Sequence, residues 1–462
     1  MPSRRGAAGS RSRGRTQGTA GMTILRAAGG DPPIDSAQTD VGRPRRPYAP
    51  DMVRDQFPAL GMISGQRNVV FLDGPGGTQL PRSVVRAMAH YMTTSNGQAG
   101  WPSITSHRTD AMVAEARQFY GDFLNSSTPA EIRFGPNMTA LTFQVSRSLG
   151  GTLQPGDQVI VTRLDHEANV SPWQCLAERG VEVKVVDVMD KECCLDMSDL
   201  ENQLSQRTKV VAIGYASNAV GTVNPVQKIC ELAHRVGAIT YVDAVQYAPH
   251  GSIDVQALGC DALVCSAHKF CGPHLGILWM QSALMERLPA YKVRPAPDKI
   301  EIGSQNHECV AGSLAAGRYL EQIGTSVLGE SKDGPRGQRR DRLRAAMGAI
   351  EEYESELCAR LLDLLRQIPG VAIYGFGDRS VLAYRTPTVA ITAANRLPGE
   401  VATQLASMGI FVSSGDFYAR MLIERLGLAP SGGVLRIGLV HYNTTEEVDR
   451  FVEGLIQVLS LA

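Results

Sequence analysis

The chain of 462 residues has few lysines, no net charge and no long apolar run. Only eight of its 46 basic residues are lysine, and the 46 acidic residues equal the basic residues in number. A balanced charge gives no global field that attracts nucleic acid or an anionic membrane surface. No apolar run approaches the ~18 residues that a membrane-spanning helix needs. We therefore expect a soluble protein with no nucleic-acid or membrane partner.

The nine cysteines follow no pattern that favours a metal site or a disulfide framework. They form no C-x-x-C pair and no Cys/His metal spacing, so we expect no metal. Their odd number in a long chain disfavours a disulfide scaffold and favours a reducing compartment, so we expect a cytoplasmic location.

The N-terminal segment is basic and poor in structure-forming residues. Residues 1–30 contain six arginines and no acidic residue, and they lack the apolar core of a secretory signal. We interpret residues 1–46 as a disordered basic tail, with Met22 as an alternative start. A transit-like or nucleic-acid-binding tail is the other interpretation.

Short β-branched runs alternate with helical segments from about residue 80 to 280, and a segment such as 225–236 has the pattern of a crossover helix. Several runs are apolar nearly throughout, which is typical of strands buried on both faces of a mainly parallel sheet. This pattern predicts an α/β domain around a twisted central sheet. The candidate strands are Glu131–Phe134, Gln158–Thr162, Val181–Val186, Lys209–Ile213, Ala238–Val242, Asp261–Cys265 and Gly276–Met280.

The second half of the chain predicts a smaller α+β domain. Residues 326–342 are rich in charge and glycine and predict an exposed loop. Apolar residues at helical spacing then predict a helix over 342–367, and another over 446–459 ends the chain. We predict a large α/β domain over 47–325, whose N-terminal segment contributes to the small domain, and the small domain itself over 343–462.

Polar side chains follow two neighbouring apolar strands in the stretch 238–280. Asp243 ends the run ITYVD, and Ser266, His268 and Lys269 follow DALVC. The carboxyl ends of strands in α/β sheets are where ligands bind. An isolated Asp there is more often a cap and an isolated loop Lys a solvated charge, but chance rarely supplies the whole set, which includes Gln246.

These residue types suit pyridoxal phosphate. A lysine amine forms a Schiff base with the cofactor (the internal aldimine) and then acts as acid and base at the substrate Cα. A carboxylate beside the pyridine nitrogen keeps that nitrogen protonated, so the ring accepts electrons. A serine and a histidine beside the lysine can hydrogen-bond the phosphate.

Five blocks resemble the class V aminotransferases, which are fold-type-I pyridoxal-phosphate enzymes, and are most similar to the cysteine desulfurase-like group. The resemblance runs from about Phe71 to the C-terminus. It implies a pyridoxal 5'-phosphate cofactor, an α-amino acid substrate and a homodimer. The blocks are FLDGPGGTQLP, SNAVGTVNPV, VDAVQ, SAHK and LRIGLVHYNTTEEVDRFVEGL.

The resemblance assigns roles around the cofactor ring. It makes Lys269 the Schiff-base lysine, pairs Asp243 with the pyridine nitrogen, and brings Gln246 to the ring hydroxyl. His166, in LDHEANVSPW, matches the histidine that stacks on the cofactor, and Asn218 matches a residue near the ring hydroxyl. Without the family context, His166 would be a core or surface histidine and Asn218 a turn residue.

The resemblance also assigns the phosphate and carboxylate sites. FGPNMTALTFQ predicts a strand, a turn and a helix N-terminus, where an anion is favoured. Met138, through its amide, and Thr139 lie at its start, and Thr139 also has the alternative role of a helix cap. Ser304, in IEIGSQN, resembles a phosphate ligand that the family borrows from the partner subunit. Arg436, in an apolar strand, matches the arginine that binds the substrate carboxylate.

The chain departs from the desulfurase pattern at the catalytic thiol. Tyr418 stands where the family has its mobile cysteine, and Ser413 where one desulfurase group has an arginine. No cysteine lies between Cys358 and Arg436, and Cys309 is a weak substitute, since free cysteine is usually a buried hydrophobe. Tyr418 is either an acid or base or a packing residue.

We therefore predict a desulfurase-like carbon–sulfur (Cβ–X) lyase acting through Lys269. A class V aminotransferase and an amino-acid epimerase are the alternatives within the same family. A non-catalytic pyridoxal-phosphate-binding regulatory protein is the alternative from another class, and the presence of Lys269 and Arg436 argues against it.

Overall fold

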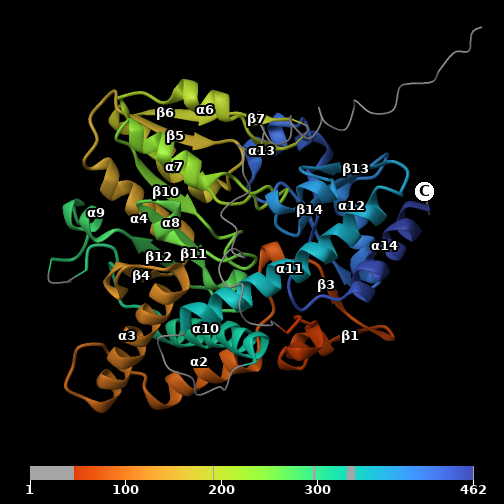
Figure 1. Cartoon of the computed structure of the whole chain (residues 1–462), viewed down its shortest axis with the longest axis horizontal. Coiled ribbons are helices and arrows are strands. Elements are labelled where there is room, and N and C mark those ends of the chain that lie inside the picture. The colour runs from red at the N-terminus through yellow and green to blue at the C-terminus, as the bar shows by residue number, and fades with distance from the viewer. Residues whose placement is uncertain (1–45, 191, 295–297, 330–338, 461–462) are drawn as a thin grey trace, which may run out of the picture.

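The computed structural model describes residues 46–190, 192–294, 298–329 and 339–460. Two lobes lie side by side, a large one around a seven-stranded sheet and a small one around a four-stranded sheet (Figure 1). Within these ranges no helix is both long and apolar enough to cross a membrane. The predicted tail, up to residue 45, lies outside the described residues.

The large sheet has the strand order β4-β12-β11-β10-β9-β5-β6. Strands β11, β10, β9, β5 and β6 run parallel, and β12 is antiparallel to both of its neighbours. All seven predicted strands are confirmed, each within one residue at either end. Their bounds are Ile132–Gly135 (β4), Gln158–Thr162 (β5), Glu182–Val186 (β6), Thr208–Gly214 (β9), Ile239–Asp243 (β10), Ala262–Ser266 (β11) and Gly276–Met280 (β12).

Both faces of this sheet are buried, which is why its strands are apolar nearly throughout. Successive side chains of β5 point to opposite faces. Val159 and Val161 pack in the cluster that includes helix α4 (Met138–Gly150), whereas Ile160 packs in the cluster that includes α7 (Val226–Arg235). The helices thus fix the sheet between them and leave its carboxyl edge open.

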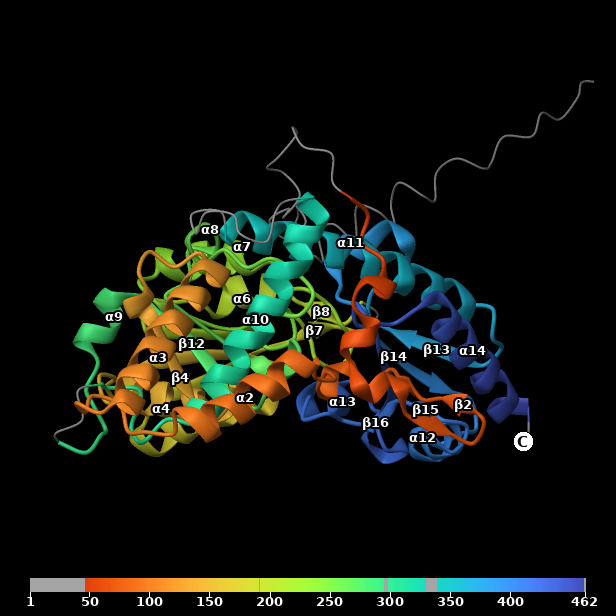
Figure 2. The same cartoon turned by 90° about the horizontal axis from the view of Figure 1, so that it is seen from below.

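The small sheet is antiparallel, with the order β13-β14-β17-β16. Figure 2 shows α12 and α14 beside it, and the N-terminal segment, in red, running past it. That segment contributes β3 (Val70–Phe71), which pairs in parallel with β15 (Ile410–Phe411). The sheet and its helices are Val371–Tyr374 (β13), Thr388–Ala393 (β14), Ser413–Gly415 (β16), Val434–Gly438 (β17), Pro398–Ser407 (α12) and Thr445–Ser460 (α14).

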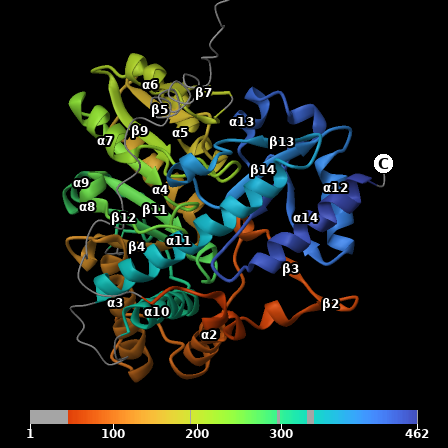
Figure 3. The same ribbon diagram turned by 45° about the vertical axis from the view of Figure 1, so that its right-hand side comes forward.

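Two long helices correct the predicted loop over 326–342. Helix α10 (His307–Leu328) runs into it from one side and α11 (Arg339–Leu365) from the other, while 330–338 lie outside the described residues. Val327 is fully buried, and Arg342 is buried with its guanidinium 2.6 Å from Glu321. The ends of the predicted loop are therefore packed helix. Figure 3 shows α11 running diagonally across the molecule towards the small lobe.

The remaining elements complete the two lobes. The predicted helices over 225–236 and 446–459 are confirmed as α7 and α14. The other helices are Arg82–Thr94 (α2), Ile104–Leu124 (α3), Ser171–Gln174 (α5), Met197–Gln203 (α6), Val255–Leu258 (α8), Ser282–Arg287 (α9) and Arg420–Arg425 (α13). The other strands are Ile63–Ser64 (β1), Arg67–Asn68 (β2), Val188–Met189 (β7) and Cys194–Leu195 (β8).

Candidate active site

A cavity of about 310 Å³ lies where the carboxyl edge of the large sheet faces the small lobe. Parallel strands bring the residues that follow them to one edge, so positions far apart in sequence meet there. All of the predicted site residues except Ser304 line this cavity. They are Met138, Thr139, His166, Asn218, Asp243, Gln246, Ser266, His268, Lys269, Tyr418 and Arg436.

Lys269 lies in the short turn Ala267–Lys269 that follows β11. Its Nζ donates a hydrogen bond to the carbonyl oxygen of Pro75. Burial is the main cause that lowers the pKa of Lys269 to about 8; the positive charge of Arg436 contributes to the shift, and Asp243 opposes it. An amine with this pKa is neutral in about one molecule in ten at pH 7, far more than an ordinary lysine, so it can act as a nucleophile and a base.

Asp243, at the end of β10, is buried beside a second carboxyl group, Asp165. Burial raises the pKa of Asp243 to about 6, while Lys269 and a hydrogen bond from the Val245 amide (2.9 Å) lower it. Asp165 also lines the cavity and was not predicted. Burial, and then the nearby Asp243, hold the pKa of Asp165 well above its usual value. Two neighbouring buried carboxyl groups resist double ionisation, so this pair favours a single negative charge.

The main chain is fitted closely around Asp165. Its Oδ1 accepts a hydrogen bond from the amide of Gly214, and a Cβ at Gly214 would lie only 2.5 Å from that oxygen. The sequence held a signal for this residue, since the acid directly precedes His166 in LDHEANVSPW. Its proximity to Asp243 depends on the strand order and is not visible in the sequence.

His166 is held as a neutral ring. Its Nδ1 accepts a hydrogen bond from the amide of Ala168 at 2.9 Å, so the proton of the neutral ring is on Nε2. Burial is the main cause that lowers its pKa to about 4, followed by the charges of Lys269 and Arg436. A neutral imidazole that is held in one orientation is suited to stacking on a flat ring.

Helix α4 begins at the cavity, as predicted, but its cap is a different residue. Asn137 Oδ1 accepts the amide of Ala140 at 2.8 Å, so Asn137 is the cap and the capping role considered for Thr139 is wrong. Thr139 is instead exposed in the first turn. The Met138 amide donates to Ser266 Oγ at 3.3 Å, which ties the helix start to the end of β11.

His268 has a buried ring nitrogen without a partner and lines the same cavity as the helix start. Its ring stacks on His274 with centroids 4.7 Å apart, and burial is the main cause that lowers its pKa to about 3. Its Nδ1 has no hydrogen-bond partner among the described residues. A free ring nitrogen and a helix N-terminus on one cavity can accommodate a phosphate.

Arg436 projects from β17 with an unused donor. The residue is buried, its Nη1 donates to the Asn218 carbonyl at 2.7 Å, and its Nε lacks a partner within the described ranges. Burial lowers the pKa of Arg436 to about 10, and Asp73 opposes the shift, so the guanidinium stays charged at neutral pH. A charged fork with a free donor suits a carboxylate. Asp73 was not predicted as part of this site.

The amide side chains of Gln246 and Asn218 connect the cavity to the small lobe. Gln246 Nε2 donates to Thr388 Oγ1 at 2.9 Å, and Asn218 Nδ2 donates to the Phe417 carbonyl at 2.8 Å. Asn218 Oδ1 is buried and has no partner in the described part of the chain. This leaves an acceptor for a hydroxyl group of a ligand.

Phe417 and Tyr418 form an unusual turn at the mouth of the cavity. Their φ angles are 55° and 58°, in the left-handed region that costs non-glycine residues about 1–2 kcal/mol each. The Phe417 ring lies 3.8 Å from the Arg436 guanidinium carbon, and the Tyr418 ring centroid lies 5.3 Å from that of His166. The Tyr418 side chain is 69% exposed. Phe417 was missed by the sequence analysis.

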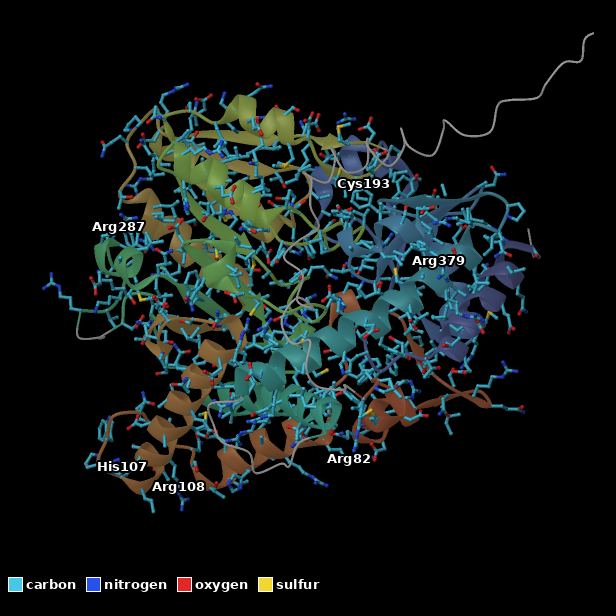
Figure 4. The ribbon with its side chains drawn as sticks, in the orientation of Figure 1. Arg82, His107, Arg108, Cys193, Arg287 and Arg379 are labelled. Atoms are coloured by element: carbon cyan, nitrogen blue, oxygen red, sulfur yellow. The ribbon has the colours of Figure 1, made fainter. Side chains whose placement is uncertain are left out.

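Two groups of predicted or considered residues lie away from the cavity. Ser304 is exposed and accepts a hydrogen bond from Gln98 at 3.4 Å, and its role towards a partner subunit stays a prediction. No cysteine of the described residues lines the cavity. Burial raises the pKa of the Cys309 thiol. Another cysteine, Cys193, is labelled in Figure 4 and lies next to the short strand β8.

The residues present fit pyridoxal phosphate. The cavity joins a lysine amine of lowered pKa, a buried carboxyl group, a neutral histidine ring and a helix start with an open ring nitrogen. These are the groups needed for covalent attachment, for pairing with a pyridine nitrogen, for stacking and for binding a phosphate. Lys269, Asp243, His166 and His268 would hold these four parts of the cofactor.

Comparisons with known proteins agree with this fit. The family model for class-V aminotransferases matches residues 70–346 and 341–451. A probable cysteine desulfurase from Synechocystis is 32% identical over 87% of this chain and 94% of its own, and an aminotransferase-like protein from Gibberella zeae is 30% identical over 89% and 99%.

Solved structures share the fold. A cysteine desulfurase from Thermococcus onnurineus has a TM-score of 0.79 at 25% identity, covering 90% of this chain and all of that one. One from Escherichia coli has a TM-score of 0.75 at 26% identity, with the same coverage. The chain therefore belongs to the class-V aminotransferase family of pyridoxal-phosphate enzymes and has the fold-type-I architecture of the cysteine desulfurases.

Proposed function

We propose that the protein cleaves the bond between Cβ and sulfur, or another β-substituent, of an α-amino acid, with pyridoxal phosphate attached to Lys269. The observation that carries this proposal is the combination of Lys269, Asp243 and Arg436 around one cavity with Tyr418 at its mouth. In the overall reaction a β-thio amino acid and water give a thiol, pyruvate and ammonium.

Arg436 binds and orients the substrate. Its buried charge and open Nε favour the substrate carboxylate, and its contact with Asn218 holds the guanidinium in place. Fixing the carboxylate there turns the amino acid so that its Cα faces Lys269, and such positioning accounts for a large part of a rate enhancement.

Lys269 and Asp243 handle protons. When bound, pyridoxal phosphate withdraws electrons from the substrate Cα and makes its proton easier to remove. Lys269 Nζ takes up that proton, because its lowered pKa leaves neutral amine at neutral pH. Asp243, with a pKa of about 6, is mostly ionised at neutral pH and holds a proton on the pyridine nitrogen.

The residues at the mouth of the cavity fit an elimination reaction better than desulfuration. Desulfuration needs a cysteine thiolate that attacks the sulfur of the substrate. The described part of this chain presents Tyr418 rather than a cysteine to the cavity. Elimination requires only proton removal and departure of the β-substituent, so no second nucleophile is needed. The relatives named as desulfurases support the substrate type, a sulfur-containing amino acid.

Transamination is the second candidate, supported by the aminotransferase-like relative from Gibberella zeae. It would use the same lysine to move the proton from Cα to the cofactor. An epimerase would return the proton to the opposite face. We further propose a homodimer in which Ser304 of each subunit reaches the other subunit's phosphate.

Product analysis separates these reactions. Purified protein loaded with pyridoxal phosphate is incubated with L-cysteine, S-methyl-L-cysteine and S-phenyl-L-cysteine, and thiol, pyruvate and oxo acids are quantified. The proposal predicts equal amounts of thiol and pyruvate from an S-substituted cysteine. An oxo acid that retains its sulfur substituent would identify a transaminase, and the opposite enantiomer an epimerase. Alanine and persulfide from L-cysteine would identify a desulfurase.

A further inference from the structure

We propose that Phe417 and Tyr418 form an aromatic wall that makes the site select amino acids with an apolar β-substituent, above all an aromatic one. The inference rests on the proposed lyase function and adds the substrate class. The preferred substrates are then S-aryl and S-benzyl cysteines rather than cysteine itself.

The wall stands where a substrate side chain must pass. Both residues line the cavity together with Arg436, whereas Asp243 and Ser266 are buried at the strand ends. An amino acid held by its carboxylate on Arg436 and by its amine near Lys269 has one direction left for its β-substituent, towards the mouth. There it meets the Tyr418 ring, which is 69% exposed.

The wall is preformed. The Tyr418 amide donates to Asp416 Oδ1 at 3.0 Å, and its carbonyl accepts the Glu167 amide at 2.7 Å. The Phe417 carbonyl accepts the Asn218 side-chain amide at 2.8 Å. Contacts on both sides therefore hold two left-handed residues in place, and a strained turn of this kind at a cavity mouth marks a functional position.

The chemistry of the wall favours an apolar partner. Phe417 covers one face of the Arg436 guanidinium at 3.8 Å, so the carboxylate binds at the edge of the fork. The Tyr418 ring is tilted by 39° against His166, and the residue lines the cavity while remaining 69% exposed, so the ring is accessible to a substrate substituent. An aromatic substituent would cover that exposed ring, whereas the small thiol of cysteine would leave it in water.

The test compares specificity in the holoenzyme. The ratio of kcat/KM for S-phenyl-L-cysteine to that for S-methyl-L-cysteine is measured in the wild type, Tyr418→Phe and Tyr418→Ala. Aromatic stacking predicts that Tyr418→Ala lowers the ratio about two- to tenfold, and that Tyr418→Phe retains it. The matched control is Tyr374→Ala, on the edge strand β13 and not on the cavity, which leaves the ratio unchanged.

A binding measurement gives a readout that needs no turnover. Calorimetry with 3-(phenylthio)propanoate, which lacks the amino group, should show weaker binding to Tyr418→Ala than to the wild type and Tyr374→Ala. An equal kcat/KM ratio in the wild type and Tyr418→Ala would contradict the proposed aromatic wall. A lower ratio in Tyr418→Phe would contradict aromatic stacking and assign the effect to the hydroxyl group instead. If the wild type forms no thiol from any substrate, the lyase proposal fails, and the calorimetry still decides about the wall.

Discussion

The inner end and the mouth of the cavity are built by different means. At the inner end, Asp243 and Ser266 are the last residues of adjacent buried strands and Lys269 lies in the turn after the second, so the sheet itself sets their positions. At the mouth, Phe417 and Tyr418 lie in a strained turn of the small lobe, which hydrogen bonds with Asn218, Asp416 and Glu167 hold in place. The sheet therefore fixes the residues for the cofactor chemistry, whereas we propose that this one turn sets the choice of substrate.

Removing the lysine should have the largest effect, because the inner end has no substitute for it. Lys269→Ala is expected to lower kcat on the order of 10⁴-fold, since it removes both the attachment point and the base. Lys228→Ala, which changes an exposed residue of α7, is the control. Activity near the wild-type value in Lys269→Ala, measured by pyruvate release, would contradict the assignment.

The carboxylate arginine, which joins the two regions, should have the next largest effect. Arg436→Lys keeps the charge but loses the planar fork, and we expect a 10- to 100-fold loss of kcat/KM from about 1.5–3 kcal/mol of charged hydrogen bonding. The loss should appear mainly as a higher KM. An unchanged KM for every amino acid tested would show that the carboxylate binds elsewhere.

The lowered pKa of Lys269 predicts how the inner end captures its cofactor. Only the neutral amine attacks an aldehyde, and the folded-state pKa is about 8 rather than the usual 10.5. The rate of pyridoxal-phosphate capture by the apo protein should therefore rise about tenfold from pH 7 to pH 9 and level off above that. Absorbance after mixing gives the rate. A rise that continues through pH 10 would indicate an unperturbed lysine.

The smallest effect concerns the stability of the mouth. Tyr418→Gly removes a side chain that is mostly exposed and relieves a left-handed residue. We expect a gain of about 0.5–1 kcal/mol in the free energy of unfolding, because glycine adopts this conformation without the 1–2 kcal/mol penalty but loses part of the gain through unfolded-state entropy. Urea unfolding measures it. Tyr418→Ala keeps its Cβ and should gain nothing, and equal stability of the two variants would refute the strain.

The same contrast explains what the sequence could predict. The strands and the residues at their ends were predictable, because apolar runs and the polar residues that follow them are local features. The pairing of Asp165 with Asp243 was missed, since it arises from the order of β5, β9 and β10 in the sheet. The left-handed pair at Phe417 and Tyr418 was missed because neither residue type favours that conformation.

The predictions of helix ends were wrong for a related reason. The charged composition of 326–342 predicted a solvent-exposed loop. Arg342 instead forms an ion pair with Glu321 where α10 packs against α11. Thr139 was considered as a cap, whereas Asn137 fills that position two residues earlier. Such choices depend on tertiary partners that a single sequence does not display.

The most direct test of the central claim is to find where the cofactor attaches. The protein loaded with pyridoxal phosphate is reduced with borohydride, digested and mapped by mass spectrometry, and its eight lysines make the map simple to interpret. We expect the pyridoxyl group on the peptide that contains Lys269. A label on another lysine, or none at all, would contradict it.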